Sequence, residues 1–178
     1  MLMALWGLMM GACAPALDWR DVRLAGAELT VLFPCKPAVQ ERTIELDGRP
    51  WSARLQACDA GDQTFAALTL TPPTPEAAVS PSQPVADMAP LLAQLVESAA
   101  VRWGVAQGAQ LAPPGIKLPA AVQGTWSRHV RDGQGGKALL TQALFLPVQG
   151  HLVQLSMHGA HLSEPAMDSF FGQLRVGS

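Results

Sequence analysis

A β-hairpin signal lies in the first third of the chain. Asp47 and Gly48 separate two runs of alternating apolar and polar residues, 43–46 and 51–55. An Asp-Gly pair favours the tight turn between antiparallel strands, because that turn needs positive φ at both of its central positions. The sequence therefore predicts a β-hairpin here, and an antiparallel sheet built around it.

Two cysteines, Cys35 and Cys58, lie on either side of this predicted hairpin. The hairpin register places Cys58 opposite Pro37, which is a close sequence neighbour of Cys35. Diagonal neighbours in a sheet are roughly 7–8 Å apart at Cα, slightly beyond disulfide range, so a bend has to bring the cysteines together. Pro34 and Pro37 flank Cys35 and favour such a bend. We predict a Cys35–Cys58 disulfide, with two buried free thiols as the alternative.

The chain starts with a short apolar segment, 1–12 (MLMALWGLMMGA), which has no charged side chain. It is too short to cross a bilayer as a helix, which takes roughly 20 apolar residues, and it has the size of the apolar region of a signal peptide. Residues 10–13 (MGAC) resemble the bacterial lipoprotein signal, in which a small residue precedes a cysteine that becomes the acylated N-terminus. This predicts Cys13 as a lipidation site.

Two alternatives to lipidation stay open. Residues 14–16 (APA) match the A-x-A pattern for ordinary signal cleavage, which would make Leu17 the first residue of the mature protein. In the second alternative the protein is cytosolic, and the segment 1–12 is an apolar strand or helix of its fold. Once Cys13 is assigned to the leader, an even number of cysteines remains, as is typical of exported proteins.

These observations predict a protein of the cell envelope, either a membrane-anchored lipoprotein facing the periplasm or a soluble periplasmic protein. Its first expected partner is then the membrane itself, through the N-terminal lipid on Cys13. Charged residues make up only 15% of the chain and the net charge is −2, without a basic run. Nothing in the sequence therefore offers the phosphate-neutralising surface that nucleic acid requires, and we expect no nucleic-acid partner.

The remainder of the chain, 17–178, has the size of a single domain with its own core. The first half reads as an antiparallel meander, with strands predicted over 29–33, 39–46, 51–58 and 64–71. The segment 72–84 contains five prolines and is predicted to be an exposed connector, because proline interrupts both sheet ladders and helix interiors.

The second half combines helices and strands. Apolar residues from Val85 to Trp103 repeat at spacings of three and four, which predicts a helix over 85–103. Further elements are predicted over 121–131 (strand), 138–147 and 151–158 (hairpin) and 164–175 (helix). A run of strands followed by a helix occurs twice along the chain, which predicts an α+β domain. We expect a mostly antiparallel sheet of about six to seven strands, covered by a long mid-chain helix and a C-terminal helix.

Two segments resemble a known family. Residues 29–37 (LTVLFPCKP) are similar to the F-P-x-K-P opening of small exported proteins with the Mog1/PsbP-like fold, and 170–174 (FFGQL) lie where those proteins have a C-terminal helix with an F-x-x-x-L pattern. The resemblance covers about residues 18–176 in element order and extends to lipoproteins and periplasmic proteins of proteobacteria. It implies an antiparallel sheet between helices and a binding or assembly role without shared catalytic residues.

The sequence lacks the motifs that carry common enzyme chemistry: G-x-S-x-G, the P-loop, H-E-x-x-H, G-x-G-x-x-G and the EF-hand loop. We therefore predict no catalytic residue, no metal site and no cofactor. The expected function is that of a non-enzymatic envelope module that binds a protein or a small apolar ligand.

A small periplasmic enzyme is the alternative function. Its candidate residues are His129, His158 and His161, together with Asp59 and Asp62 in one turn. Imidazole side chains are ligands for Zn²⁺ or Cu²⁺. Paired aspartates can act as acid–base groups, although such aspartates more commonly cap their own turn. A cleft that joins these groups with perturbed pKa values would favour the enzyme, whereas scatter over opposite faces would remove its support.

Overall fold

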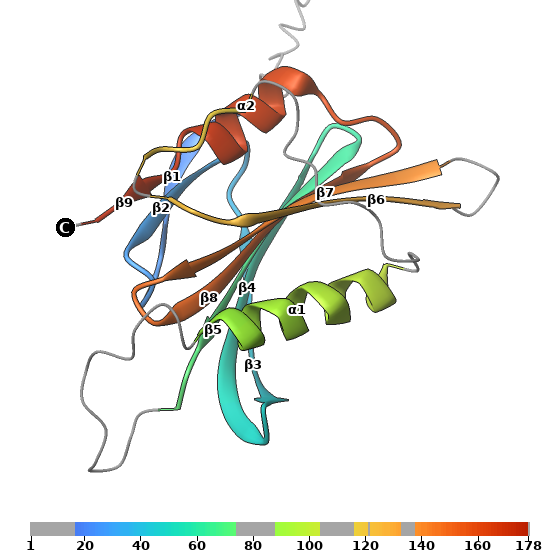
Figure 1. Ribbon diagram of the computed structural model, residues 1–178. Coiled ribbons are helices and arrows are strands. Elements are labelled where there is room, and N and C mark those ends of the chain that lie inside the picture. Colours follow the sequence, from blue (N-terminus) through green and yellow to red (C-terminus); the bar gives the residue numbers. More distant parts are fainter. Residues whose placement is uncertain (1–16, 74–87, 104–115, 121, 133–137, 178) are drawn as a thin grey trace, which may run out of the picture.

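The computed structural model describes residues 17–73, 88–103, 116–120, 122–132 and 138–177 (Figure 1). The proposed leader with Cys13 lies outside the described residues, as do most of the proline-rich connector and residues 85–87 of the predicted helix.

The described residues form an α+β domain, as predicted. Its strands are β1 (Arg20–Leu24), β2 (Leu29–Phe33), β3 (Ala38–Leu46), β4 (Arg49–Ala60), β5 (Gln63–Thr71), β6 (Thr125–Asp132), β7 (Ala138–Val148), β8 (His151–Gly159) and β9 (Arg175–Val176). Its helices are α1 (Ala89–Arg102) and α2 (Glu164–Gly172). Among the residues that the structure describes, no helix is both long and apolar enough to cross a membrane.

Six strands form one antiparallel sheet in the order β3-β4-β5-β8-β7-β6. The predicted hairpin is confirmed: Leu46 lies opposite Arg49, and Asp47 and Gly48 have φ values of 53° and 66°. The strand predicted over 29–33 was wrongly expected in the same meander: β2 pairs with β1 and β9, which the sequence pattern does not predict, in a separate sheet of order β1-β2-β9. The bend at Pro34 and Cys35 turns the chain from β2 into β3 of the large sheet. The large sheet therefore has the predicted size, and the small sheet adds a third packing element.

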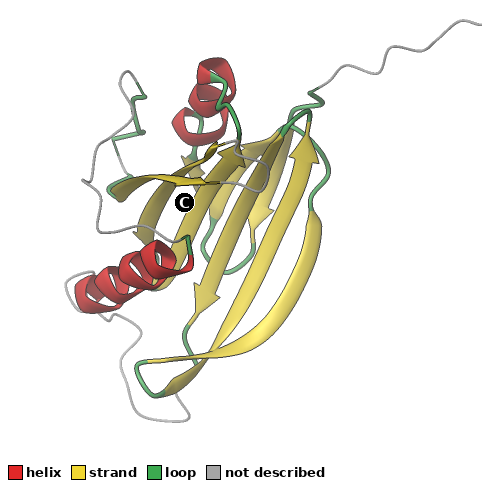
Figure 2. Ribbon diagram, turned by 90° about the vertical axis from the view of Figure 1, so that its right-hand side faces the viewer, coloured by secondary structure: helices red, strands yellow, loops and turns green. Residues whose placement is uncertain are grey.

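The two faces of the large sheet carry separate cores. In Figure 1, α2 and the small sheet lie on one side of the large sheet and α1 on the other, and Figure 2 shows the same layers from the side. On the first side, Phe170 of α2 meets Phe33 and Phe65 edge-on, with ring centroids 5.2 and 5.4 Å apart. On the second side, Leu95 of α1 packs in a cluster with Leu152.

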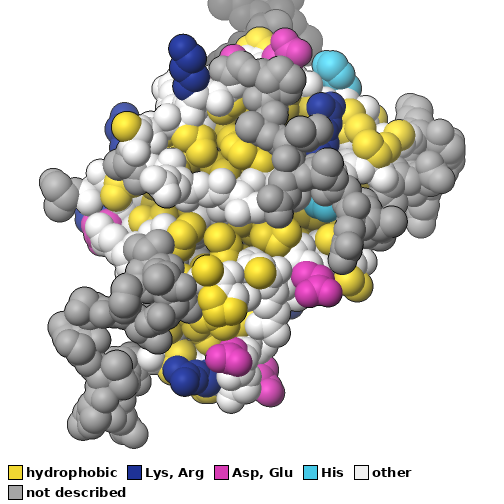
Figure 3. Space-filling model, in the orientation of Figure 1, with side chains coloured by type: hydrophobic (Ala, Val, Ile, Leu, Met, Phe, Trp, Pro, Cys, Tyr) yellow, Lys and Arg dark blue, Asp and Glu magenta, His cyan; other side chains and the backbone are white. Residues whose placement is uncertain are grey.

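The C-terminal helix is shorter than predicted. We expected a helix over 164–175, but α2 ends at Gly172, and Arg175 pairs with Thr30 of β2 in an antiparallel bridge. Leu174 is buried in the core, so the chain leaves the helix there and adds an edge strand to the small sheet. On the face shown in Figure 3, apolar side chains are exposed over the middle, and most charged side chains lie toward its edges.

The predicted pairing of Cys35 with Cys58 is confirmed. Their sulfur atoms are 2.06 Å apart and their Cα atoms 6.1 Å apart. Cys35 follows β2 of the small sheet, and Cys58 belongs to β4 of the large sheet. The disulfide therefore links the two sheets across a sequence separation of 23 residues.

Candidate functional site

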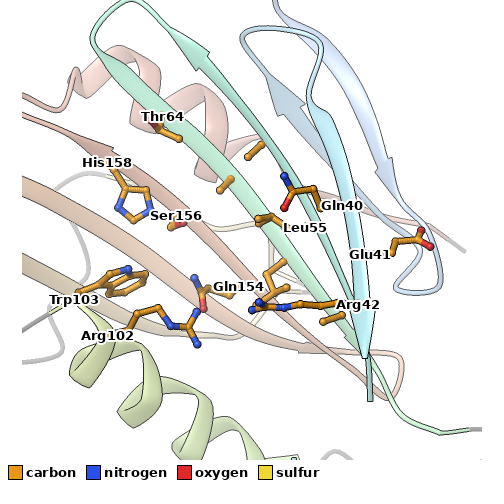
Figure 4. Close-up of a pocket in the computed structure, with 14 residues that line it drawn as sticks. Gln40, Glu41, Arg42, Leu55, Thr64, Arg102, Trp103, Gln154, Ser156 and His158 are labelled. Atoms are coloured by element: carbon orange, nitrogen blue, oxygen red, sulfur yellow. Dashed lines mark hydrogen bonds between the residues drawn. The ribbon is translucent and has the colours of Figure 1, made fainter. Parts of the chain in front are cut away.

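A hollow of about 350 Å³ lies on the α1 face of the large sheet, beside the carboxyl end of α1 (Figure 4). Its floor is formed by β4, β5 and β8, and its rim by β3 and by Arg102 and Trp103 at the end of α1. The hollow thus lies where α1 stops covering the sheet.

A row of small residues explains why the floor is low. The register aligns one small residue from each strand of the large sheet, in the order Ala38, Ala57, Ala66, Ser156, Ala143, Ser127. Residues directly opposite each other in a sheet project from the same face. Because all six side chains are short, the α1 face has a trough that crosses every strand, and the hollow occupies its β4–β8 part.

A polar row runs beside the trough. In strand order it consists of Asp59, Thr64, His158, Thr141 and His129. The Thr64 hydroxyl donates to Asp59 Oδ1 at 2.6 Å, and Thr141 Oγ1 pairs with His158 Nδ1 at 2.9 Å. Both histidines also pair with serines of the trough through Nε2: His129 with Ser127 and His158 with Ser156, each at 3.0 Å.

Trp103 covers this polar row from the end of α1. Its ring centroid lies 5.0 Å from that of His129 and 5.5 Å from that of His158. Burial lowers the pKa of His129 below its ordinary value, because a charged imidazolium loses its hydration there. His129 Nδ1 is buried and has no hydrogen-bond partner among the described residues.

Two arginines bring positive charge to the hollow. Arg42 of β3 and Arg102 of α1 extend toward one another, with Gln154 between them in the view of Figure 4. Within the described part of the chain, neither arginine forms an ion pair. Glu41 points away from the hollow (Figure 4) and pairs with Arg54 on the opposite face of the sheet.

Gln154 lies on the floor of the hollow, on β8 between Leu68 of β5 and Phe145 of β7. Its side chain is only 7% exposed, and its Oε1 atom has no hydrogen-bond partner among the residues described. Burying an unsatisfied amide oxygen costs about 1–3 kcal/mol. A polar group left in this state is therefore a candidate for contact with a ligand.

The structure brings together only some of the candidate residues of the enzymatic alternative. His129 and His158 lie on one face, on either side of Thr141, and Asp59 reaches the same row at its outer end. His161 and Asp62 are exposed in turns and do not line the hollow. In the part of the chain that the structure describes, no group of three or more His, Cys, Asp or Glu side chains is placed to hold a metal ion.

Ser156 and His158 have the separation of a nucleophile and a general base. The third group, however, is the neutral hydroxyl of Thr141, which stabilises an imidazolium less than the carboxylate of a catalytic triad does. Ser156 belongs to a central strand paired on both sides, and α1 presents its carboxyl end, which carries partial negative charge. Sheet pairing on both sides of Ser156 leaves its strand no backbone N–H groups for an oxyanion hole, so the arrangement suits ligand binding better than acyl transfer.

Arg42, Arg102 and Gln154 belong to no motif in the sequence and are not predicted from it as site residues. Comparison of the chain with protein-family models, with curated proteins and with solved structures gives no match in any of the three. The chemistry of the hollow is therefore the main structural indication of function.

Proposed function

We propose that the protein is a non-enzymatic binding module of the cell envelope, and that the hollow holds a small, partly apolar ligand. The trough of small residues is the observation that carries this proposal. Beside the end of α1, where larger side chains would fill the surface, Ala57, Ala66 and Ser156 leave a volume of about 350 Å³ open. This volume lies in the range of small-molecule sites, about 300–1,000 Å³.

The lining has the mixture of groups that such sites use. Leu55 and Leu68 offer half-buried apolar surface on the floor. Gln154 and Ser156 offer polar atoms at the bottom, and Trp103 forms an aromatic wall. The lining therefore combines apolar surface with several placed polar groups, a combination that can bind and orient a small molecule.

The cell-envelope part of the proposal has its own support. The apolar segment 1–12 followed by Cys13 fits an exported lipoprotein, and the Cys35–Cys58 bond fits an oxidising compartment. Acylation of Cys13 would anchor the domain in the membrane, and the Mog1/PsbP-like fold is the fold that we propose for it.

Titration of the full chain with the neutral dye Nile red tests the hollow. Ala66→Leu fills the floor, and Ala93→Leu makes the same exchange on an exposed position of α1. We expect the wild-type chain and Ala93→Leu to bind the dye equally, and Ala66→Leu to bind it roughly ten-fold more weakly without a loss of thermal stability. Equal binding by all three proteins would refute the proposal, since the dye would then lie elsewhere.

Acyl transfer by Ser156 and His158 is the second candidate function, and the 3.0 Å contact between them favours it. A fluorophosphonate probe reacts with an activated serine. Labelling of the wild-type chain that Ser156→Ala abolishes would favour the enzyme, and no labelling of Ser156 would favour the binding module.

A further inference from the structure

We propose that the ligand of the hollow is a small amphipathic anion, whose carboxylate binds between Arg42 and Arg102 and whose apolar body lies on the alanine floor. This inference rests on the proposed function, to which it adds the chemical class of the ligand. It is argued from the charge that faces the hollow, from the buried amide of Gln154 and from the shape of the floor.

The charge that faces the hollow is uncompensated. Arg42 and Arg102 come from different elements, line the same hollow and extend toward one another in the view of Figure 4, and their like charges repel one another. In the described part of the chain neither has an acidic partner. A carboxylate between them removes this repulsion, and the planar guanidinium fork matches its two oxygens.

Protein carboxylates do not fill this role among the described residues. Glu41 is the only acidic residue among those that line the hollow, and its side chain points away and pairs with Arg54. Asp59 lies at the outer end of the polar row, where it accepts the hydrogen bond from Thr64. No acidic side chain of the described lining faces the two arginines, so we assign the negative charge opposite them to the ligand.

The amide of Gln154 provides an independent observation. Its side chain is more than nine-tenths buried, and Oε1 has no partner among the described residues. Gln154 lies between the two arginines in Figure 4. A carboxylate that draws the guanidinium groups onto the floor brings N–H donors toward Oε1, while the amide N–H of Gln154 can donate to the carboxylate itself. The ligand thus accepts from both guanidinium groups and from the amide N–H, and the arginines supply the donor that Oε1 lacks.

The floor selects the rest of the ligand. Ala57, Ala66 and Leu68 present apolar surface beside the charged groups, and inorganic phosphate would leave that surface exposed to water. An apolar body that covers it adds about 25 cal/mol for each Å² removed from water. The site therefore favours an amphipathic carboxylate over a compact, fully polar anion.

Calorimetric titration of the full chain with octanoate, octan-1-ol and inorganic phosphate tests this inference. We expect octanoate to bind at least about ten-fold more tightly than either of the other probes. Arg42→Gln and Arg102→Gln should each reduce octanoate affinity toward that of octan-1-ol. Arg128→Gln removes one exposed positive charge from the opposite face of β6 and should leave octanoate affinity unchanged.

The outcomes separate this inference from the proposed function. If octanoate and octan-1-ol bind equally and both lose affinity in Ala66→Leu, the preference for an anion is refuted, while the proposal that the hollow binds a small molecule stands. An absence of binding for octanoate and octan-1-ol would overturn both. An effect of Arg128→Gln as large as that of Arg102→Gln would overturn direct contact, because overall charge would then explain the affinity. If phosphate binds as tightly as octanoate, the claim that the ligand has an apolar body on the alanine floor is refuted.

Discussion

Trp103 lies against His158 with ring centroids 5.5 Å apart and ring planes at 68°, in an edge-on arrangement. Trp103 ends α1, and His158 lies near the end of β8. The contact therefore joins the last turn of the helix to the polar row of the sheet, and it places a wall of the hollow at the point where the helix is anchored. Stability of α1 and the shape of the hollow should consequently depend on the same side chain.

Trp103→Ala should lower the free energy of unfolding by about 2–4 kcal/mol, because it removes a large, partly buried ring from contact with His129, Phe145 and His158. Urea denaturation measures this change. Trp103→Phe keeps an aromatic contact and should lose less than half as much. A Trp103→Ala chain as stable as the wild type would show that the indole does not anchor the helix.

Stability should fall on the acid side of neutrality. Burial lowers the pKa values of His129 and His151 below 6.5 in the folded chain, so between the folded and the unfolded pKa the unfolded chain binds more protons. The contribution of these histidines is therefore fully present above pH 6.5 and decreases as the pH falls through the folded pKa values.

Denaturation measured from pH 7.5 to 5 tests this prediction. The double variant His129→Gln/His151→Gln should show a flatter dependence of unfolding free energy on pH than the wild-type chain. His161→Gln is the matched control, since His161 is exposed, and it should keep the wild-type slope. A wild-type slope in the double variant would mean that other groups cause the acid sensitivity.

Local signals in the sequence predicted most of the fold. Asp47-Gly48 and Gln149-Gly150 form turns, and both hairpins have the expected partners. The termini of the domain were harder to predict, because β1 and β9 depend on pairing with β2, and residues 29 and 175 are far apart in sequence. Arg175 lies in a strand because it pairs with Thr30 at the edge of the small sheet.

The site was less predictable than the fold. The hairpin register alone aligns Ala38 with Ala57, but the trough becomes visible only when β5 pairs with β8 and places Ala66 opposite Ser156. Arg42 and Arg102 come from separate elements, so no spacing along the chain relates them. His129 and His158 were selected for their chemistry, and the sheet brings them together on either side of Thr141.

Loss of the disulfide should destabilise the domain. In the chain-entropy model, a loop with a sequence separation of 23 residues stabilises the folded state by about 3 kcal/mol. The double variant Cys35→Ser/Cys58→Ser should lose about this much in urea denaturation under oxidising conditions. Reductant should destabilise the wild-type chain by a similar amount and leave the double variant unchanged. A wild-type chain that is insensitive to complete reduction would contradict the prediction.

Gly124, immediately before β6, should not tolerate a side chain. A Cβ at this position would lie 2.7 Å from the backbone oxygen of Phe145, and a backbone atom held in the sheet cannot move aside cheaply. Gly124→Ala should therefore lower the free energy of unfolding by about 1–3 kcal/mol. Gly172→Ala is the matched control, because its Cβ would meet the nearest atom, the backbone oxygen of Lys117, at 3.7 Å, an ordinary contact. Urea denaturation of both variants should separate them clearly, and a Gly124→Ala chain as stable as the wild type would show that β6 can shift away from β7 at this end of the sheet.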